Sequence, residues 1–354
     1  MTKLWDEISK PSFVINKKRA IANIKLMARK FNSQNILFRP HFKTHQSIEV
    51  GAWFTDAGVS KISVSSVDMA RQFFDAGWRD ISIVFSFNRR EIKALNQFSA
   101  EAQISILLED LDTAKYISEN STADLNVFLK IDCGYHRSGI LISEFETIKN
   151  IALKIQELPK LKLKGLLSHF GNTYSAKNKE EVQTIFESSL KAINNLRDFL
   201  SPNFPDLIIS IGDTPSASLM DNFSGVDEMR PGNFIFYDWM QYRIGSCTTD
   251  QISAIMLCPV VAKHADRNEL IIHGGVVHFS KEKLEHYGPI CDISNGFGTD
   301  VIDGVYLKSL SQEHGIVHCT EEFFSRTKIG DLIGVIPVHS CLSANLMKDN
   351  TVIY

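Results

Sequence analysis

The chain has 354 residues, of which 44% are hydrophobic and 22% charged, and this usage excludes a disordered chain, a collagen-like fibre and a coiled coil. The formal net charge is −3, from 38 basic and 41 acidic residues, so no bulk field would draw the protein to nucleic acid or to an anionic membrane. The length allows two domains of ~100–200 residues each, or one barrel with an appendage.

The sequence shows no targeting or membrane-spanning segment. Residues 1–12 carry several charges and lack the apolar core of a signal peptide. The longest apolar stretch, Ile252–Ala262, is roughly half of what a membrane-spanning helix needs. Six cysteines in a chain of this length are too sparse for a disulfide framework. These features predict a cytoplasmic protein with reduced thiols.

Between residues 36 and 240, short apolar runs typical of β-strands alternate with segments whose apolar residues recur every three or four positions. The strand-like runs are Ile36–Phe38, Lys61–Ser66, Ile81–Phe87, Ile104–Leu108, Leu125–Asp132, Leu163–His169, Leu207–Gly212 and Glu228–Phe234. Their number and the intervening helices favour an α/β fold, a (β/α)8 TIM barrel of parallel strands, over a doubly wound sheet.

After about Gly245 the helical periodicity fades and β-type runs follow, which predicts a second, mainly β domain at the C-terminus. These runs are Ile252–Ala262, Glu269–Phe279, Gly315–Cys319 and Leu332–Val338.

A barrel carries its functional residues at the carboxyl ends of its strands. The first predicted strand ends in Arg39, His41 and Lys43, which share one face if the strand continues through them. Three such groups together would be costly to desolvate without an anion or a covalent role. We expect an anionic cofactor or substrate here, with Lys43 as a Schiff-base amine, although a solvated basic strand end would give the same pattern.

Later strand ends supply further candidates. The fifth strand leads into a loop in which Gly134 and Gly139 would let Arg137 return over the barrel mouth, and the sixth offers His169 and Tyr174. The loops Gly212–Ser216 and Arg230–Asn233 follow strands seven and eight, where barrels commonly bind phosphate.

In the C-terminal domain, His339 and Cys341 would point to one side of an extended segment, and imidazole with thiolate suits zinc. Two such residues arise easily by chance, so the spacing alone favours a buried histidine and thiol over a metal site.

Taken together, the motifs resemble the D-serine dehydratase and D-threonine aldolase family. Its members are fold-type III enzymes that use pyridoxal 5'-phosphate (PLP) and have a barrel like that of alanine racemase. Arg39–His45 resembles the cofactor-lysine segment, Gly212–Ser216 and Arg230–Asn233 resemble the two phosphate loops, and His339–Cys341 stands where the family keeps a metal pair.

The resemblance implies a PLP-binding barrel at residues 17–240 and a β domain made of residues 1–16 with 241–354. It also implies a homodimer with active sites between the barrel of one subunit and the β domain of the other. Lys43 would be the Schiff-base lysine and Arg137 would contact the PLP ring oxygen. The phosphate would be held by Tyr174, Gly212, Thr214, Gly232 and Asn233, and the metal by His339 and Cys341.

Three reactions fit this scaffold, and we expect a small D-amino acid as the substrate. A dehydratase would use Lys43 to remove the α-proton and zinc to help the β-hydroxyl leave, which gives a 2-keto acid and ammonia. An aldolase would use a base such as His45 or His169 and release glycine and an aldehyde. A racemase would need two bases and no metal, so the metal pair argues against it.

The pair His339 and Cys341 resembles the dehydratase branch, and thiolate favours zinc where a carboxylate would favour Mn²⁺ or Mg²⁺. We therefore expect a PLP- and zinc-dependent dehydratase of a D-3-hydroxy amino acid such as D-serine. A non-catalytic PLP-binding protein is the alternative from another class, but such proteins resemble only the barrel and lack the C-terminal β domain.

Overall fold

The computed structural model describes residues 3–354, so the first two residues of the segment expected at 1–16 lie outside it. The chain forms two compact units, one of Lys25–Gly232 and one that combines residues up to Ile24 with Asn233–Tyr354. The six cysteines form no disulfide among the described residues. Within residues 3–354, no helix has the length and apolar character needed to cross a membrane.

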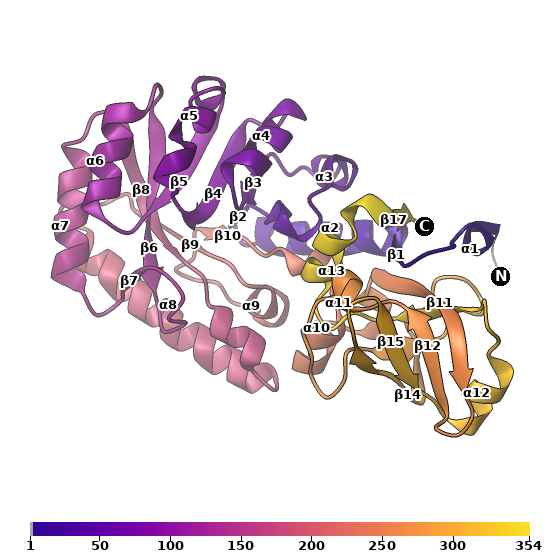
Figure 1. Ribbon diagram of the computed structural model, residues 1–354. Helices are drawn as coiled ribbons and strands as arrows, with labels where there is room; N and C mark the ends of the chain where they lie inside the picture. Colours follow the sequence, from indigo (N-terminus) through magenta and orange to yellow (C-terminus); the bar gives the residue numbers. More distant parts are fainter. Residues whose placement is uncertain (1–2) are drawn as a thin grey trace. The chain divides into compact units, whose positions relative to one another are not determined.

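The unit of residues 25–232 is a nearly closed barrel of eight parallel strands, as the sequence predicted (Figure 1). Around the barrel the strands follow the order β2, β10, β9, β8, β6, β5, β4, β3, and a parallel bridge between His41 and Ser63 links the two ends of this order. The strands are β2 (Leu37–Phe38), β3 (Lys61–Val64), β4 (Asp80–Ser86), β5 (Gln103–Leu108), β6 (Leu125–Asp132), β8 (Leu161–Ser168), β9 (Ile208–Ile211) and β10 (Glu228–Met229). A short β7 (Ile140–Leu141) pairs with β6 outside the barrel order.

Helices cover the outer side of the barrel strands, and their apolar faces explain the three- and four-residue periodicity (Figure 1). Several begin at a polar residue whose side chain accepts a backbone N–H of the first turn, as Asp110 does for α6 and Asn178 for α8. The helices are α2 (Lys17–Asn32), α3 (Ile48–Thr55), α4 (Val67–Asp75), α5 (Ile92–Leu95), α6 (Leu111–Asn120), α7 (Phe145–Gln156), α8 (Lys179–Leu200) and α9 (Thr214–Leu219).

The second unit is built on an eight-stranded, mainly antiparallel sheet with the order β12, β15, β14, β13, β16, β11, β1, β17. Its first strand comes from the beginning of the chain: β1 pairs antiparallel with β11 and parallel with β17. The strands are β1 (Ser12–Ile15), β11 (Ala254–His264), β12 (Glu269–His273), β13 (Pro289–Cys291), β14 (Val301–Leu310), β15 (His314–His318), β16 (Leu332–Val335) and β17 (Thr351–Ile353). Short helices accompany them, namely α1 (Lys3–Asp6), α10 (Trp239–Ile244), α11 (Val276–Phe279), α12 (Glu321–Arg326) and α13 (Ser340–Leu346).

Three local predictions were wrong. The run Glu269–Phe279 is not one strand, because β12 ends at His273 and α11 begins at Val276 after two glycines. His339 and Cys341 do not share an extended segment, since His339 precedes α13 and Cys341 lies in its first turn. The first barrel strand also ends at Phe38, and Lys43 lies in a 3₁₀ turn formed by Phe42–Thr44.

Candidate functional site

Lys43 projects from a turn whose two neighbouring residues are anchored in the barrel. Phe42 and Thr44 are fully buried, whereas Lys43 is exposed. The Phe42 ring lies edge-on or tilted against Phe54, Phe73 and Trp78, with centroids 4.9, 4.9 and 5.1 Å away. Burial of the residues on either side fixes the turn and leaves the amine accessible.

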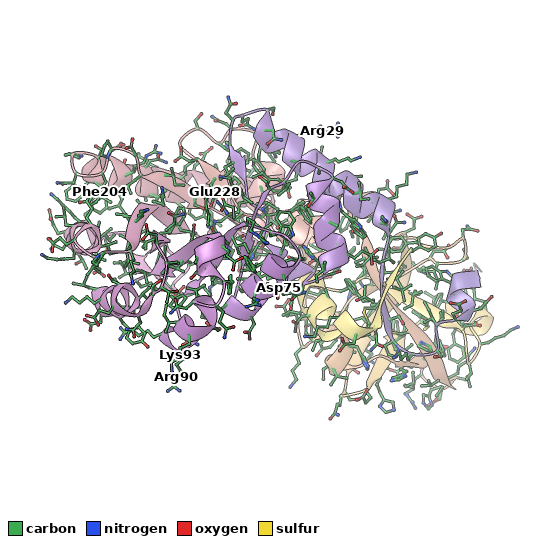
Figure 2. All side chains as sticks on the ribbon, turned by 90° about the horizontal axis from the view of Figure 1, so that it is seen from above. Arg29, Asp75, Arg90, Lys93, Phe204 and Glu228 are labelled. Atoms are coloured by element: carbon green, nitrogen blue, oxygen red, sulfur yellow. The ribbon has the colours of Figure 1, made fainter. Side chains whose placement is uncertain are left out.

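Arg39 has a different role from the one that the basic pattern suggested. Its guanidinium pairs with Glu228, Nε to Oε2 2.7 Å, and with Asp80, Nη1 to Oδ1 2.6 Å. The charge of Arg39 is therefore compensated inside the protein and needs no bound anion. Figure 2 shows Glu228 within the barrel unit, while Arg90 and Lys93 point outward from it.

Two histidines lie near the amine of Lys43. The pKa of His41 and that of His169 are both well below the usual value, chiefly because the rings are buried and in part because of the positive charge of Lys43. The Nδ1 atom of His169 makes a hydrogen bond to the carbonyl oxygen of Gly212. A carbonyl oxygen only accepts, so this contact places a proton on Nδ1, and the lowered pKa leaves the other ring nitrogen with its lone pair and the ring neutral.

The loops after strands β9 and β10 lie close to the lysine turn. A Cβ atom on Gly232 would come within 2.8 Å of Thr44 Oγ1 and 2.9 Å of the His41 carbonyl oxygen, so only glycine fits there. After β9, the backbone N–H of Thr214 donates to the Tyr174 hydroxyl at 3.2 Å, which leaves the Tyr174 O–H able to donate elsewhere.

The group around Thr214 fits a phosphate. Thr214 is fully buried, and its hydroxyl has no hydrogen-bond partner among the residues that the structure describes. A buried hydroxyl in this condition is an unmet donor, and a bound phosphate would satisfy it. Together with the accessible amine of Lys43, these residues fit PLP, and the residues that would hold it are Lys43, Tyr174, Gly212, Thr214 and Gly232.

The loop that carries Arg137 is organised by one carboxylate. Asp132, at the end of β6, accepts the backbone N–H groups of Gly134, Tyr135 and His136 at 2.9, 2.9 and 3.0 Å. Burial raises the pKa of Asp132, but these hydrogen bonds outweigh it and hold the pKa below its usual value. Arg137 is exposed and lies 5.2 Å from the Tyr135 ring centroid, and its charge contributes to the lowered pKa of His169.

The barrel also holds a lysine that the sequence motifs did not reveal. Lys130 on β6 is buried, and burial together with the charge of Arg230 lowers its pKa to about 8. Its ammonium donates to the carbonyl oxygen of Ile131 at 3.0 Å. Lys130 lies in a mostly apolar strand, so the local sequence does not mark it as special. Its neighbour Arg230 is 100 positions away in the sequence, so no short motif contains both residues.

His45 lies in an aromatic pocket. Its ring centroid is 4.5 Å from that of Phe42 and 5.7 Å from that of Phe54, and its Nδ1 accepts the backbone N–H of Ser47 at 3.1 Å. Burial lowers the pKa of His45 to about 3, so the ring is neutral and a weak base at neutral pH. These surroundings favour a packing role, and catalysis by His45 stays a prediction.

In the second unit, His339 and Cys341 lie together at the start of α13 and make a hydrogen bond with each other. Asn233 joins them: its side-chain amide donates to Asp238 Oδ2 at 2.6 Å, to Ser340 Oγ at 3.0 Å and to Cys341 Sγ at 3.5 Å. Asn233 was predicted to hold the phosphate, but its side-chain amide donates to the residues around the proposed metal pair. Only its backbone N–H stays a candidate for the phosphate.

The charges around His339 fit a cation. Burial lowers the pKa of this histidine, but the negative charges of Cys341, Asp238 and Glu282 and the hydrogen bond with Cys341 outweigh burial and raise it to about 10. A site that attracts a proton this strongly also attracts a metal ion, and its imidazole and thiolate are the ligands that zinc prefers. His339 and Cys341 would hold that ion.

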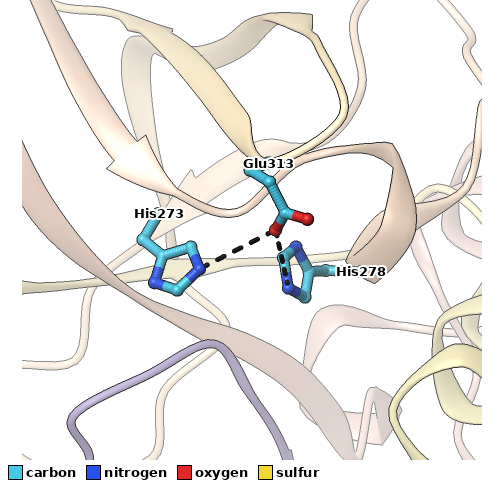
Figure 3. A group of neighbouring side chains, drawn as sticks. All are labelled: His273, His278 and Glu313. Carbon is cyan, nitrogen blue, oxygen red and sulfur yellow. Dashed lines mark ion pairs between the residues drawn. The ribbon is translucent and has the colours of Figure 1, made fainter.

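A second group of possible metal ligands lies in the same unit, where His273 and His278 face Glu313 (Figure 3). The Nε2 atoms of the two histidines are 3.9 and 3.8 Å from Glu313 Oε2. The Nδ1 atom of His278 accepts the N–H of Gly275 at 3.0 Å, which places the ring proton on Nε2, the atom that a metal would need. We therefore assign no metal to this group, in which each histidine lies within ion-pair distance of Glu313.

Comparisons with known proteins agree with this architecture. Residues 15–238 match the family model described as Alanine racemase, N-terminal domain, and residues 253–353 match a serine dehydratase domain model. The chain is 28% identical over 352 residues to D-threo-3-hydroxyaspartate dehydratase of Delftia sp. (strain HT23), with 94% of this chain and 90% of that protein covered. It is 27% identical over 346 residues to D-serine dehydratase of Dictyostelium discoideum, with 91% and 87% covered.

The fold is similar to a solved structure of D-threo-3-hydroxyaspartate dehydratase, a cysteine-to-alanine mutant in the metal-free form. The TM-score is 0.88 at 26% identity, with 96% of this chain and 93% of that chain covered. The barrel with a lysine at its strand ends thus defines an alanine racemase-like protein. The chain belongs to this family, and the predicted resemblance to its D-serine dehydratase group is confirmed. It is a lyase of the D-serine dehydratase type.

Proposed function

We propose that the chain is a PLP- and zinc-dependent dehydratase that converts a D-3-hydroxy amino acid, such as D-serine, to a 2-keto acid and ammonia. The observation that carries the proposal is the half-buried pair His339 and Cys341, set among negative charges and contacted by the Asn233 amide. A thiolate in this position favours zinc over the hard cations that a carboxylate would select. The metal-free cysteine mutant of a related dehydratase supports a cysteine ligand.

The residues of the barrel would bind the cofactor and move the first proton. Thr214, Tyr174 and the backbone of Gly232 would hold the phosphate, and Arg137 would contact the ring oxygen. Lys43 would anchor the cofactor and then, as a free amine, take the proton from Cα of the substrate. The neighbouring His41 and His169 are neutral, so they add no positive charge beside the amine of Lys43.

When bound, PLP supplies an electron sink for the α-carbanion, and zinc supplies a Lewis acid for the departing β-hydroxyl. His339 and Cys341 would orient the metal. In the aldolase alternative the same metal would lower the pKa of the β-hydroxyl, and a base such as His45 or the neutral His169 would take the hydroxyl proton. We also propose that the protein acts on small D-amino acids as a homodimer, as the family resemblance implies.

The deciding experiment measures 2-keto acid formation by the protein loaded with PLP and zinc, on D-serine, D-threonine and D-3-hydroxyaspartate. We expect turnover that is lost in Lys43→Ala and on removal of zinc by a chelator, and kept in Lys93→Ala, which removes an outward-pointing lysine (Figure 2). Glycine and an aldehyde in place of the keto acid would assign the aldolase reaction. Full turnover without any metal would contradict the proposed mechanism.

A further inference from the structure

Asp238 is a fully buried carboxylate whose two oxygens have different partners. Oδ1 accepts the backbone N–H of Gln241 at 2.9 Å and so caps the first turn of α10. This capping needs one oxygen only, and an asparagine would provide it equally well. The second oxygen, Oδ2, is therefore not explained by the helix that Asp238 begins.

Oδ2 of Asp238 contacts several residues around the proposed metal pair, His339 and Cys341. It accepts the backbone N–H of Ser340 at 2.9 Å and the Asn233 amide at 2.6 Å, and the Ser340 hydroxyl lies 3.3 Å from it. It also lies 3.4 Å from Nδ1 of His339, an ion-pair distance without the alignment of a hydrogen bond. Every one of these neighbours is, or can be, a hydrogen donor, so the position requires an oxygen that carries negative charge.

The contact with His339 selects one form of the imidazole ring. A carboxylate oxygen beside Nδ1 favours the proton on that nitrogen, which leaves the lone pair on Nε2. Metal-binding histidines generally donate their other ring N–H to a carboxylate or carbonyl, which fixes the ring and makes it a better ligand. The same carboxylate holds Asn233, whose amide also reaches Cys341 Sγ at 3.5 Å.

From this geometry we infer that Asp238 is the positioning residue of the metal pair, an inference that rests on the proposed zinc site. Asp238 keeps the proton of His339 on Nδ1 so that Nε2 binds the metal, and through Asn233 it orients the Cys341 thiolate.

The first test compares the zinc affinity of the full-length protein with that of Asp238→Asn, by competition with a chelator of known affinity. We expect a loss of about 10- to 100-fold, the usual effect of removing such a partner. Asp110→Asn is the matched control, because Asp110 also caps a helix through a carboxylate oxygen, which accepts Thr113 N–H at 2.7 Å, but lies in the barrel unit. Its zinc affinity should equal that of the wild type.

A second measurement needs no altered Asp238. In ¹⁵N NMR of histidine-labelled, zinc-loaded wild-type protein, the signals lost in His339→Gln identify His339, and we expect a protonated Nδ1 and a metal-bound Nε2. Zinc bound through Nδ1, or wild-type affinity in a folded Asp238→Asn, would overturn the inference alone. A wild-type protein that takes up no zinc through His339 and Cys341 would instead contradict the proposed function, and the inference with it.

Discussion

Lys130 is an ionisable group whose pKa is lowered inside the barrel. Lys130 is buried, and the charges of Arg230 and Arg137 act on it. No carboxylate oxygen of the described residues lies within ion-pair distance of its ammonium. Burial is therefore the largest effect and lowers the pKa of Lys130 to about 8. In the unfolded chain the same amine has a pKa near its ordinary value of 10.5. The folded protein thus binds this proton less tightly than the unfolded chain does.

This difference predicts how stability depends on pH. Between about pH 8 and 10.5 the unfolded chain holds the Lys130 proton and the folded protein does not, so the contribution of Lys130 to the unfolding free energy should rise with pH, by at most about 1.4 kcal/mol per pH unit. His339, whose pKa is raised on folding to about 10, contributes in the opposite direction, so the Lys130 contribution is read as the difference between wild type and variant. Lys130→Met should remove this rise. Urea unfolding at pH 7.5, 8.5 and 9.5 measures it.

Lys154→Met is the control, because Lys154 is exposed and pairs with Glu157 on the surface. It should leave the pH dependence as in the wild type. The prediction is wrong if wild type and Lys130→Met respond to pH in parallel.

At the scale of elements, the buried acid Glu228 on β10 ties several barrel strands together. Its Oε2 accepts Arg39 Nε beyond the end of β2 at 2.7 Å, and its Oε1 accepts the Ser210 hydroxyl on β9 at 2.6 Å. Arg39 in turn reaches Asp80 at the start of β4. Because β2 and β10 contain only two residues each, few backbone hydrogen bonds hold them in the barrel. The side-chain contacts of Glu228 therefore stabilise this part of the barrel.

Glu228→Gln should therefore destabilise the barrel severely. Without this charge, Arg39 keeps only its ion pair with Asp80, and Arg230 loses its ion pair with Glu228. Breaking a buried ion pair in this way typically costs about 3–5 kcal/mol of unfolding free energy. Asp75→Asn is the matched control, because it breaks the exposed pair with Arg71 at 2.9 Å and should cost less than about 1 kcal/mol. Chemical denaturation of both variants measures the difference, and equal costs would contradict the role given to Glu228.

The longer barrel elements were predictable because each of them is long enough to show its own period. The run Leu125–Asp132 is a strand with the expected bounds. The short helices of the second unit were not predicted. With four to seven residues, they are too short for their apolar residues to show a helical repeat that can be told from the alternation of a strand. The Gly274–Gly275 step, which ends β12, was the one local signal there.

At the scale of the whole molecule, the candidate cofactor residues lie in one unit and the candidate metal residues in the other. Zinc should therefore slow amide hydrogen exchange first around 339–341, and PLP should slow it first around the lysine turn and the loop 212–216. A ligand at 100 times its Kd stabilises what it binds by about 2.7 kcal/mol. Hydrogen exchange followed by mass spectrometry measures both effects, with His339→Gln as the zinc control. Zinc protection that survives in His339→Gln would contradict the assignment.

The candidate site was partly predictable for a related reason. Motifs at strand ends identified Lys43 and the loops near Thr214, because a barrel brings all of its strand ends to one edge. Asp238 and Lys130 were missed, since their importance comes from contacts with residues far away in the sequence. Asp238 lies 101 positions before His339, and only folding of the second unit brings the two together.

The place of β1 in the second sheet has a consequence for synthesis on the ribosome. Phe13, Val14 and Ile15 are fully buried between β11 and β17, and β17 contains the last strand residues of the chain. At ~5–20 residues per second, this apolar strand would wait on the order of tens of seconds before its last partner is made. During that time the barrel sequence can fold, while the first strand of the chain remains an unpaired edge that a chaperone or another nascent chain could bind.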